Sequence, residues 1–366
     1  MSEWKNTTIG DVLTLQRGFD ITRADQRAGS IPVVSSGGIG SYHDTAAVHG
    51  PGVVIGRKGT LGKTFYLPGD YWPHDTTLWV KDFKGNFSRF VYYFFLNLDV
   101  MGLDVGSANP TLNRNHVHPL PVRWPGLAEQ KRIADLLSAL DDKIAVNDRI
   151  VGSCDELRAL RFQHWRRSNA NLVENFPLSS LASFVNGRAF TKDATGTGRM
   201  VIRIAEINSG PSASTVYNDI DVPDEHLAHP GDVLFAWSGS LAVTRWFRET
   251  GIINQHIFKV IPSSKVPKWL ALELIDEKLA MFKGIAADKA TTMGHIQRRH
   301  LDEVVSVPSP AGTAQLDVEL GPLWERALSA EQESLKLAKL RSTLLPKLMS
   351  GEIRVRDAEQ VVEDVT

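Results

Sequence analysis

The chain has 366 residues, of which 42% are hydrophobic and 23% charged, and its formal net charge is −1. This length suggests two or three domains, and the composition is typical of soluble globular proteins. The most hydrophobic segment, Phe90–Leu96, is far shorter than the ~20 residues that a membrane-spanning helix requires. Met1–Asn6 is too polar to begin a secretory signal, and the single cysteine, Cys154, forms no internal disulfide. We therefore expect a cytoplasmic protein with no membrane partner.

The near-zero net charge gives no electrostatic argument for a polyanionic partner. A self-sufficient nucleic-acid-binding protein usually has a clear excess of lysine and arginine. If this chain binds DNA, its basic side chains must be clustered locally, or partner subunits must supply part of the phosphate contact.

Residues 1–125 have the pattern of a mixed α/β domain. Short runs of β-branched and aromatic residues, bounded by glycine and proline, predict strands at Ile31–Val34, Val53–Ile55 and Thr77–Val80. Apolar residues at i, i+3 and i+4 spacing predict a helix from Ser88 to Leu98. We interpret this segment as one globular domain, called domain 1 below.

Residues 126–168 predict one long helix, from about Leu127 to Trp165. This stretch has no proline and a single Gly152, and at 1.5 Å per residue it would form a rod of ~60 Å. Cys154 is expected to fill the core of its apolar stripe, and Asn147 is expected to fix the helix register. The stripe comprises Ile133, Leu136, Leu137, Leu140, Ile144, Ile150, Val151, Leu157 and Leu160.

Residues 169–312 repeat the α/β pattern and are called domain 2 below. The predicted strands are Val201–Ile204, Val233–Phe235 and His256–Val260, and Lys268–Phe282 is the predicted helix.

Residues 313–350 predict a second long helix, and we interpret residues 351–366 as a C-terminal tail. Gly321-Pro322 should kink this helix or mark its start, and Pro346 should end it. Seven-residue spacing relates Leu316, Leu323, Ala330, Leu337 and Leu344, and Leu320, Ala327 and Ser334 widen the seam. Such a repeat favours a coiled coil, most simply an antiparallel pair of the two long helices. The alternative is two unrelated amphipathic helices, each packed on its own domain.

The two halves of the chain carry four sequence blocks in the same order, with spacings that drift from 169 to 184 residues. Such a pattern indicates an internal duplication with insertions in its loops. The corresponding blocks are Ile9–Gly18 and Leu178–Gly187, Pro51–Leu61 and Pro230–Leu241, Thr111–Val117 and His295–Leu301, and the leucines of the two long helices, which lie 180 residues apart.

Gly56–Thr64 resembles a phosphate-binding P-loop, but five residues separate Gly56 from Gly62, where that motif needs four. The corresponding Ala236–Leu241 also lacks the lysine. What remains is a glycine-rich turn whose basic side chains could approach a DNA backbone.

The sequence lacks the motifs of a catalytic centre. The motif by which amino-directed DNA methyltransferases hold an extruded base is absent, Asn109-Pro-Thr being the nearest stretch. There is no Cys/His cluster with metal-ligand spacing, no Gly-x-Ser-x-Gly elbow and no nuclease-like carboxylate pair flanked by lysine. We therefore expect that the protein is not an enzyme. The missing motifs also argue against the alternative of a stand-alone methyltransferase.

Two corresponding segments, Asn113–His116 and Gln297–His300, combine amide and guanidinium groups, which pair with adenine and guanine edges. Polar loops precede both segments. A solvated loop with a helix cap is the alternative interpretation. The candidate DNA-binding residues are Arg57, Lys58, Thr60, Lys63, Asn109, Asn113, Arg114, Asn115, His116, Ser238, Ser240, Thr291, Thr292, Gln297, Arg298 and Arg299.

Over about residues 4–355 the chain resembles the specificity subunits of type I restriction–modification enzymes. Ala128–Ile144 is similar to the central conserved region of that family and Leu340–Ile353 to its distal one. Each globular copy is similar to a target recognition domain, including the turn at Gly56–Gly62 and the start of the block at Pro230–Leu234. Trp237-Ser-Gly-Ser departs from the basic form of this turn, because it contains no lysine or arginine.

The resemblance implies two mixed α/β target recognition domains, separated by two long helices in an antiparallel coiled coil. It implies that each domain reads one half of a bipartite, asymmetric site in double-stranded DNA, and that the helices set the spacer. Two methyltransferase subunits carrying S-adenosylmethionine would dock on the helices and methylate flipped adenines. Restriction subunits would add ATP- and Mg²⁺-dependent translocation and cleavage, unless the system only methylates. The chain itself would bind no cofactor and no metal. The remaining alternative is a coiled-coil interaction scaffold that does not read DNA.

Overall fold

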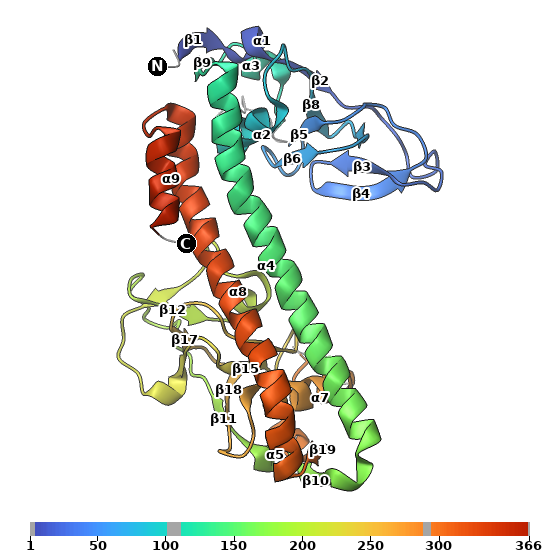
Figure 1. Ribbon diagram of the computed structural model, residues 1–366, viewed down its shortest axis with the longest axis vertical. Helices are drawn as coiled ribbons and strands as arrows, with labels where there is room; N and C mark the ends of the chain where they lie inside the picture. Colours follow the sequence, from blue (N-terminus) through green and yellow to red (C-terminus); the bar gives the residue numbers. More distant parts are fainter. Residues whose placement is uncertain (1–3, 101–110, 288–293, 365–366) are drawn as a thin grey trace. The chain divides into compact units, whose positions relative to one another are not determined.

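The computed structural model describes residues 4–100, 111–287 and 294–364 (Figure 1). The chain forms two compact units, Met1–Asp142 with Leu337–Thr366 (unit 1) and Lys143–Lys336 (unit 2). Each unit therefore contains one globular domain and a stretch of both long helices. The domain limits expected from the sequence stay predictions, because this division follows spatial contacts and cuts through the helices.

Domain 1 is built on a four-stranded antiparallel sheet in the order β2-β8-β5-β6, covered by helix α2. A smaller sheet has the order β4-β3-β7, and β1 pairs with β9 where the domain meets the long helix. The elements are β1 (Lys5–Thr8), α1 (Ile9–Val12), β2 (Thr14–Arg17), β3 (Ile31–Ser35), β4 (Gly38–His43), β5 (Gly52–Gly56), β6 (Thr64–Leu67), β7 (Trp72–Pro73), β8 (Thr77–Asp82), α2 (Ser88–Asn97), α3 (Arg114–Val117) and β9 (Pro121–Trp124).

A buried glutamine joins domain 1 to the first turn of the long helix α4 (Leu127–Ser168). The Gln130 side-chain amide donates to Asn86 Oδ1 (2.7 Å) and to the Pro125 carbonyl (2.9 Å), and its Oε1 accepts from the Phe87 backbone N–H (2.9 Å). These bonds satisfy a polar group that would be costly to bury alone. Beside these hydrogen bonds, Phe90 packs edge-on against Trp124, with 5.2 Å between the ring centroids. The two rings belong to the apolar core next to Gln130.

Domain 2 has the same plan. Its main sheet has the order β11-β18-β15-β16, its smaller sheet β13-β12-β17-β14, and β10 pairs with β19. The elements are η2 (Ala170–Leu172), β10 (Val173–Pro177), α5 (Leu178–Leu181), β11 (Ala182–Asn186), β12 (Arg199–Ile202), α6 (Ile204–Ser209), β13 (Tyr217–Asn218), η3 (Asp224–His226), β14 (Leu227–Ala228), β15 (Val233–Ala236), β16 (Ala242–Arg245), β17 (Gly251–Ile253), β18 (Ile257–Pro262), α7 (Lys268–Ala287), η4 (Arg298–Asp302) and β19 (Val304–Pro308).

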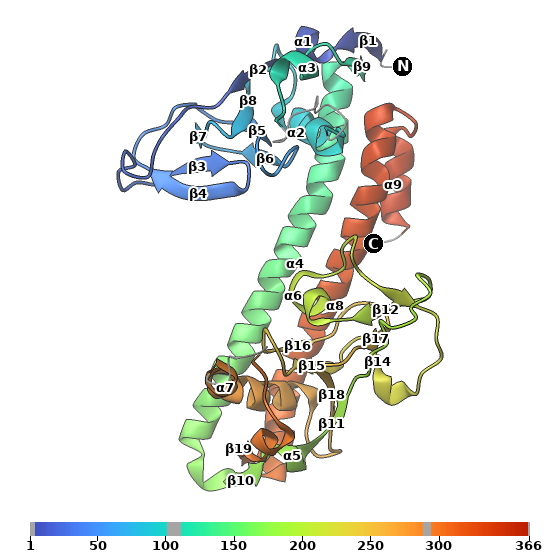
Figure 2. The same ribbon diagram turned by 180° about the vertical axis from the view of Figure 1, so that it is seen from behind.

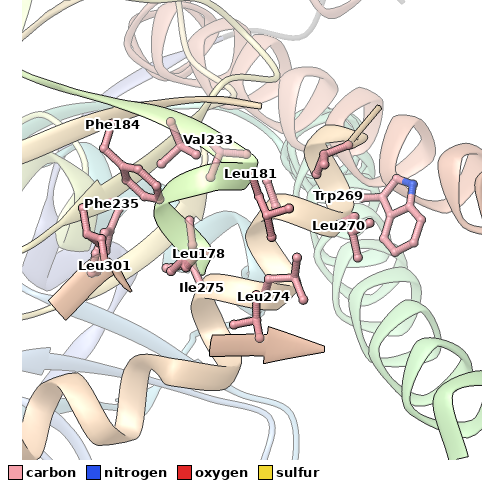
Figure 3. Close-up of a cluster of buried hydrophobic side chains, with 14 of the residues drawn as sticks. Leu178, Leu181, Phe184, Val233, Phe235, Trp269, Leu270, Leu274, Ile275 and Leu301 are labelled. Carbon is pink, nitrogen blue, oxygen red and sulfur yellow. The ribbon is translucent and has the colours of Figure 1, made fainter. Parts of the chain in front are cut away.

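The core of domain 2 lies between helix α7 and the main sheet (Figure 3). Trp269, Leu270 and Leu274 of α7 are buried with Val233 and Phe235 of β15. The predicted helix exists but continues past Phe282 to Ala287, and Ala286 in this extension is also buried against the core.

The duplication is confirmed in the backbone as well as in the strand order. The Gly18 N–H donates to the Thr77 carbonyl at 3.0 Å, and in the second copy the Gly187 N–H donates to Ile257 at 3.0 Å. Similarly, Leu112 donates to the Arg57 carbonyl at 2.9 Å, as Ile296 does to Trp237 at 3.1 Å. The two copies therefore share one chain path, and a position in one has a definite counterpart in the other.

The long helices α4 and α8 (Pro310–Ser350) run antiparallel in both units (Figure 2). In unit 1, Arg341 forms an ion pair with Asp141. In unit 2, Asn147 Nδ2 donates to Glu333 Oε2 at 2.8 Å. Unit 1 also has a hydrogen bond from Arg123, just before α4, to the Ser350 carbonyl at 3.2 Å, and in unit 2 Arg158 lies over the Trp324 ring at 5.4 Å. Within each unit the residue numbers of α8 therefore fall as those of α4 rise, so the antiparallel prediction is confirmed.

Two predictions about the helices are wrong. Helix α8 neither starts at Gly321-Pro322 nor ends at Pro346 but continues to Ser350, because buried side chains such as Leu320, Trp324 and Leu344 hold the helix on both sides of the prolines. A kink at Gly321-Pro322 stays a prediction. Within the C-terminal tail, Val355–Glu363 form helix α9 with Val355 and Ala358 buried.

Among the described residues, none of the helices combines the length and the hydrophobicity that a membrane-spanning segment requires.

The second error concerns the stripe of α4. Leu157 and Leu160 are 43% and 57% exposed, whereas Arg158 and Phe162 are buried in their place. The apolar pattern allowed two faces at this point of the helix. The structure selects the face on which Arg158 meets Glu273 of α7.

Candidate DNA interface

An open hollow of about 600 Å³ lies on domain 1 where the end of β2, the turn after β5 and helix α3 meet. It unites two segments that the sequence marked separately, the basic turn near Arg57 and the polar segment at Asn113. The residues that line it are Gln16, Arg17, Gly18, Phe19, Asp20, Arg57, Leu78, Asn113, Arg114 and Asn115.

Glycines set the backbone around this hollow. A Cβ on Gly18 would lie 2.1 Å from the His74 carbonyl oxygen, so β2 can pass this segment only without a side chain. Gly59 and Gly62 have φ angles of +74° and +73°, a region that favours glycine. The turn therefore bends back on itself, and the Gly62 N–H donates to the Gly56 carbonyl at 2.9 Å.

Backbone hydrogen bonds then hold the basic turn between two neighbouring segments. The N–H of Arg57 donates to the Thr76 carbonyl at 2.8 Å, and the Arg57 carbonyl accepts from Leu112. Lys58 forms an isolated bridge with Thr111. This frame places Arg57 beside Asn113, although the two residues are distant in sequence.

The hollow carries an excess of positive charge. Arg17, Arg57 and Arg114 line it and Lys58 borders it, whereas Asp20 and Asp75 are the carboxylates beside them. Burial and the neighbouring Arg17 guanidinium lower the pKa of the Arg57 side chain. Two guanidinium groups crowded in this way favour the approach of an acceptor-rich partner, such as a nucleic acid.

In domain 1, the candidates Arg57, Asn113, Arg114 and Asn115 line the hollow. Asn113 also caps helix α3, because its Oδ1 accepts from the Asn115 N–H at 3.0 Å. The helix-cap alternative is therefore correct for this oxygen.

The other candidates of domain 1 lie elsewhere. Lys63 donates to the Gly37 carbonyl at 3.0 Å and lies over the Phe65 ring, and Thr60 is an exposed residue of the turn. His116 is exposed on α3 outside the lining, and Asn109 lies outside the described residues.

In domain 2, the counterpart of Arg57 is Trp237, and its surroundings are aromatic. The Trp237 ring stacks on Phe258 at 5.7 Å and 28°, and its Nε1 donates to Asn186 Oδ1 at 2.8 Å. Arg298 donates to the Phe184 carbonyl at 3.0 Å, which ties this candidate to the sheet. The domain 2 surface thus differs chemically from the hollow of domain 1.

The remaining candidates of domain 2 are dispersed. Ser238 is buried and bridges to His295, and Ser240 lines a separate hollow with Lys283 of α7. Gln297 and Arg299 are exposed at helix η4, and Thr291 and Thr292 lie outside the described residues.

Arg17, Asp75 and Asn186 are site residues that the sequence interpretation missed. The sequence did contain a signal for Arg17 and Asn186. Both residues directly precede the glycine that ends the first repeated block, and they differ in chemistry between the two copies. Asp75 had no such signal, since only the fold brings it to Arg17, whose Nη2 lies 2.9 Å from Asp75 Oδ2.

Comparison with known proteins shows similarity to one family. Residues 1–151 match the model of the type I restriction modification DNA specificity domain. This match covers less than half of the chain, and the chain is also similar to type I specificity subunits. It is 23% identical over 198 residues to the Type I restriction enzyme EcoBI specificity subunit of Escherichia coli, which covers 51% of this chain and 41% of that subunit. The resemblance inferred from the sequence is confirmed.

Two further similarities extend over more of the chain. The MjaIX specificity subunit of Methanocaldococcus jannaschii is 20% identical over 313 residues, or 75% of this chain and 71% of that subunit. The crystal structure of the S subunit of a type I restriction-modification system from M. genitalium has the same fold. It has a TM-score of 0.66, is 13% identical, and the match covers 95% of this chain and 96% of that one.

The described residues contain no group of three or more His, Cys, Asp or Glu side chains that could hold a metal ion. The glycine-rich turn at Gly56–Gly62 is bound to its own neighbours, as described above. The expectation that the chain binds no cofactor itself stays a prediction.

Proposed function

We propose that this chain is the sequence-specific DNA-binding subunit of a cytoplasmic type I restriction–modification complex, with each domain reading one half of a bipartite site. The observation that carries the proposal is one chain path present twice with different side chains at equivalent surface positions. Arg17 and Arg57 of domain 1 correspond to Asn186 and Trp237 of domain 2. A protein that reads two unlike half-sites needs this combination of equal geometry and unequal chemistry.

The long helices suit the role of a spacer that also binds partners. An exposed apolar strip on α4 includes Val146, Leu157 and Leu160, which are spaced so that they share one face of the helix. Exposed apolar side chains aligned on a helix are typical of a protein-docking surface. We propose that DNA adenine methyltransferase subunits dock on the helices, two per chain, and that restriction subunits join them.

In this proposal the chain has no catalytic role. Partner subunits carry S-adenosylmethionine for methylation, and ATP and Mg²⁺ for translocation and cleavage. Because the net charge of the chain is only −1, the partners also supply part of the phosphate contact.

The test is co-expression with a type I methyltransferase subunit from the same organism, followed by purification and DNA-shift assays. We expect a stoichiometric complex that shifts DNA carrying one bipartite motif, identified by methylome sequencing of cells with and without the gene. A stoichiometric complex that shifts no DNA would instead support the scaffold alternative. Absence of any complex would overturn the proposed function.

A further inference from the structure

Arg17 lies at the rim of the hollow on domain 1, and its side chain is 49% exposed. Its Nη2 lies 2.9 Å from Asp75 Oδ2 and 3.6 Å from Asp20 Oδ2. Within the described part of the chain, no hydrogen bond involves its Nε or Nη1. The guanidinium is thus held at one corner while its other N–H groups remain able to donate.

Asp75 is a rigid anchor for this arginine. Its side chain is 15% exposed, and besides Arg17 it faces His74 Nδ1 at 3.0 Å and Lys58 Nζ at 3.9 Å. The flanking backbone is fixed as well, because His74 donates to the Val34 carbonyl and Thr76 accepts from Arg57. A guanidinium held in this way loses less side-chain entropy when it binds a ligand.

The surrounding charges select the kind of group that Arg17 can bind. The carboxylates of Asp20 and Asp75 lie beside the guanidinium, and they would repel a phosphate brought to the same place. A base edge is neutral and meets no such repulsion. Among base edges, the O6 and N7 acceptors of guanine match the fork of an arginine.

We propose that Arg17 is a specificity-determining residue that reads a guanine in the half-site of domain 1, with Asp75 as its positioning residue. This inference rests on the proposed function and deepens it. Domain 2 has no equivalent, because Asn186 occupies the place of Arg17 and its Oδ1 accepts from Trp237. A guanine contact of this type is therefore confined to one half of the site.

The test uses the complete complex with its methyltransferase subunits, and single-molecule sequencing to determine the methylated motif. Exchange of residues 1–125 with those of another family member first shows which half-site belongs to domain 1. Arg17→Ala should then make one guanine position of that half-site degenerate, with a loss of discrimination of about 10- to 100-fold. The other half-site should not change.

Two conservative variants separate recognition from misfolding. Arg17→Lys keeps the charge but lacks the fork, so discrimination at the same position should fall. Asp75→Asn keeps the shape of the anchor and should weaken discrimination at that position only. The matched control is Arg23→Ala, an exposed arginine of the same domain outside the hollow, which should leave the motif intact.

Several outcomes would overturn the inference. These are a domain 1 half-site without guanine, an unchanged motif in Arg17→Ala, or affinity that falls equally for all sequences, as for a phosphate contact. All three leave the proposed function standing, because the complex still binds a bipartite site. A wild-type complex that methylates no bipartite site would overturn the proposed function and this inference together.

Discussion

Replacing Glu331 with glutamine should destabilise unit 2 strongly, because this carboxylate belongs to a buried charge network. Glu331 Oε2 accepts from Arg245 Nε at 2.8 Å, and Arg245 is only 3% exposed. Arg158, equally buried, pairs with Glu273 and Asp155. The network joins α4, α7, α8 and β16, so it links the domain to both helices of its own unit.

The expected cost follows from what remains around Arg245. Without Glu331, its nearest carboxylate is Asp155 at 3.3 Å, and that side chain is itself 38% exposed. Breaking a buried ion pair on one side costs about 3–5 kcal/mol. Glutamine retains one acceptor oxygen, so we expect about 3 kcal/mol, which corresponds to a melting point lower by about 6–12 °C for a unit of this size.

The assay is calorimetry of the full chain at pH 7.5, supported by urea unfolding. Glu325→Gln is the matched control, since Glu325 is an exposed glutamate of the same helix. Arg245→Met and the double variant complete a cycle, in which the double variant should be less destabilised than the two single variants combined. If Glu331→Gln melts like Glu325→Gln, the reasoning about the buried network is refuted.

Three further predictions concern register, packing and pH. Asn147 is fully buried, and its Oδ1 has no partner among the described residues. The Asn147→Leu variant should therefore have a higher melting point but allow more than one spacer length in the methylated motif. A single unchanged spacer length would contradict a role of Asn147 in fixing the helix register. Gly18→Ala should lower the free energy of unfolding by about 3 kcal/mol, because the added Cβ clashes with the His74 carbonyl. Gly69→Ala, whose Cβ would meet open space, should leave this free energy unchanged. Equal unfolding free energies of the two variants in urea would contradict the prediction. Burial lowers the pKa of His118, whose Nε2 accepts a hydrogen bond from the Leu15 N–H. Unit 1 should therefore be most stable above pH 6.5 and lose stability as the pH falls through the folded-state pKa of His118. Melting curves at several pH values should show this loss in the wild type but not in His118→Gln, and a wild type without the loss would contradict the prediction.

Local sequence signals predicted much of the fold. The strand at Val53–Ile55, the helix from Ser88 and the long helix from Leu127 all appear in the structure, because periodicity and turn residues act within a few neighbouring positions. The duplication was also visible in the sequence, because corresponding glycines occupy positions where the backbone leaves no room for a Cβ in either copy. Gly18 and Gly187, for example, both pass within contact of a carbonyl oxygen that no Cβ could tolerate.

Side-chain roles depended on partners distant in sequence, and only the tertiary structure decided them. Arg158 is buried and Leu160 exposed, against their hydrophobicity, because Glu273 supplies the charge that a buried guanidinium requires. Pro346 lies within a helix because the apolar seam around it outweighs the lost hydrogen bond. The recognition hollow is the clearest case. The sequence by itself determined the basic turn and the polar segment, but Arg17 and Asp75 are 58 residues apart, and only the closure of the β2–β8 pair brings guanidinium and carboxylate together.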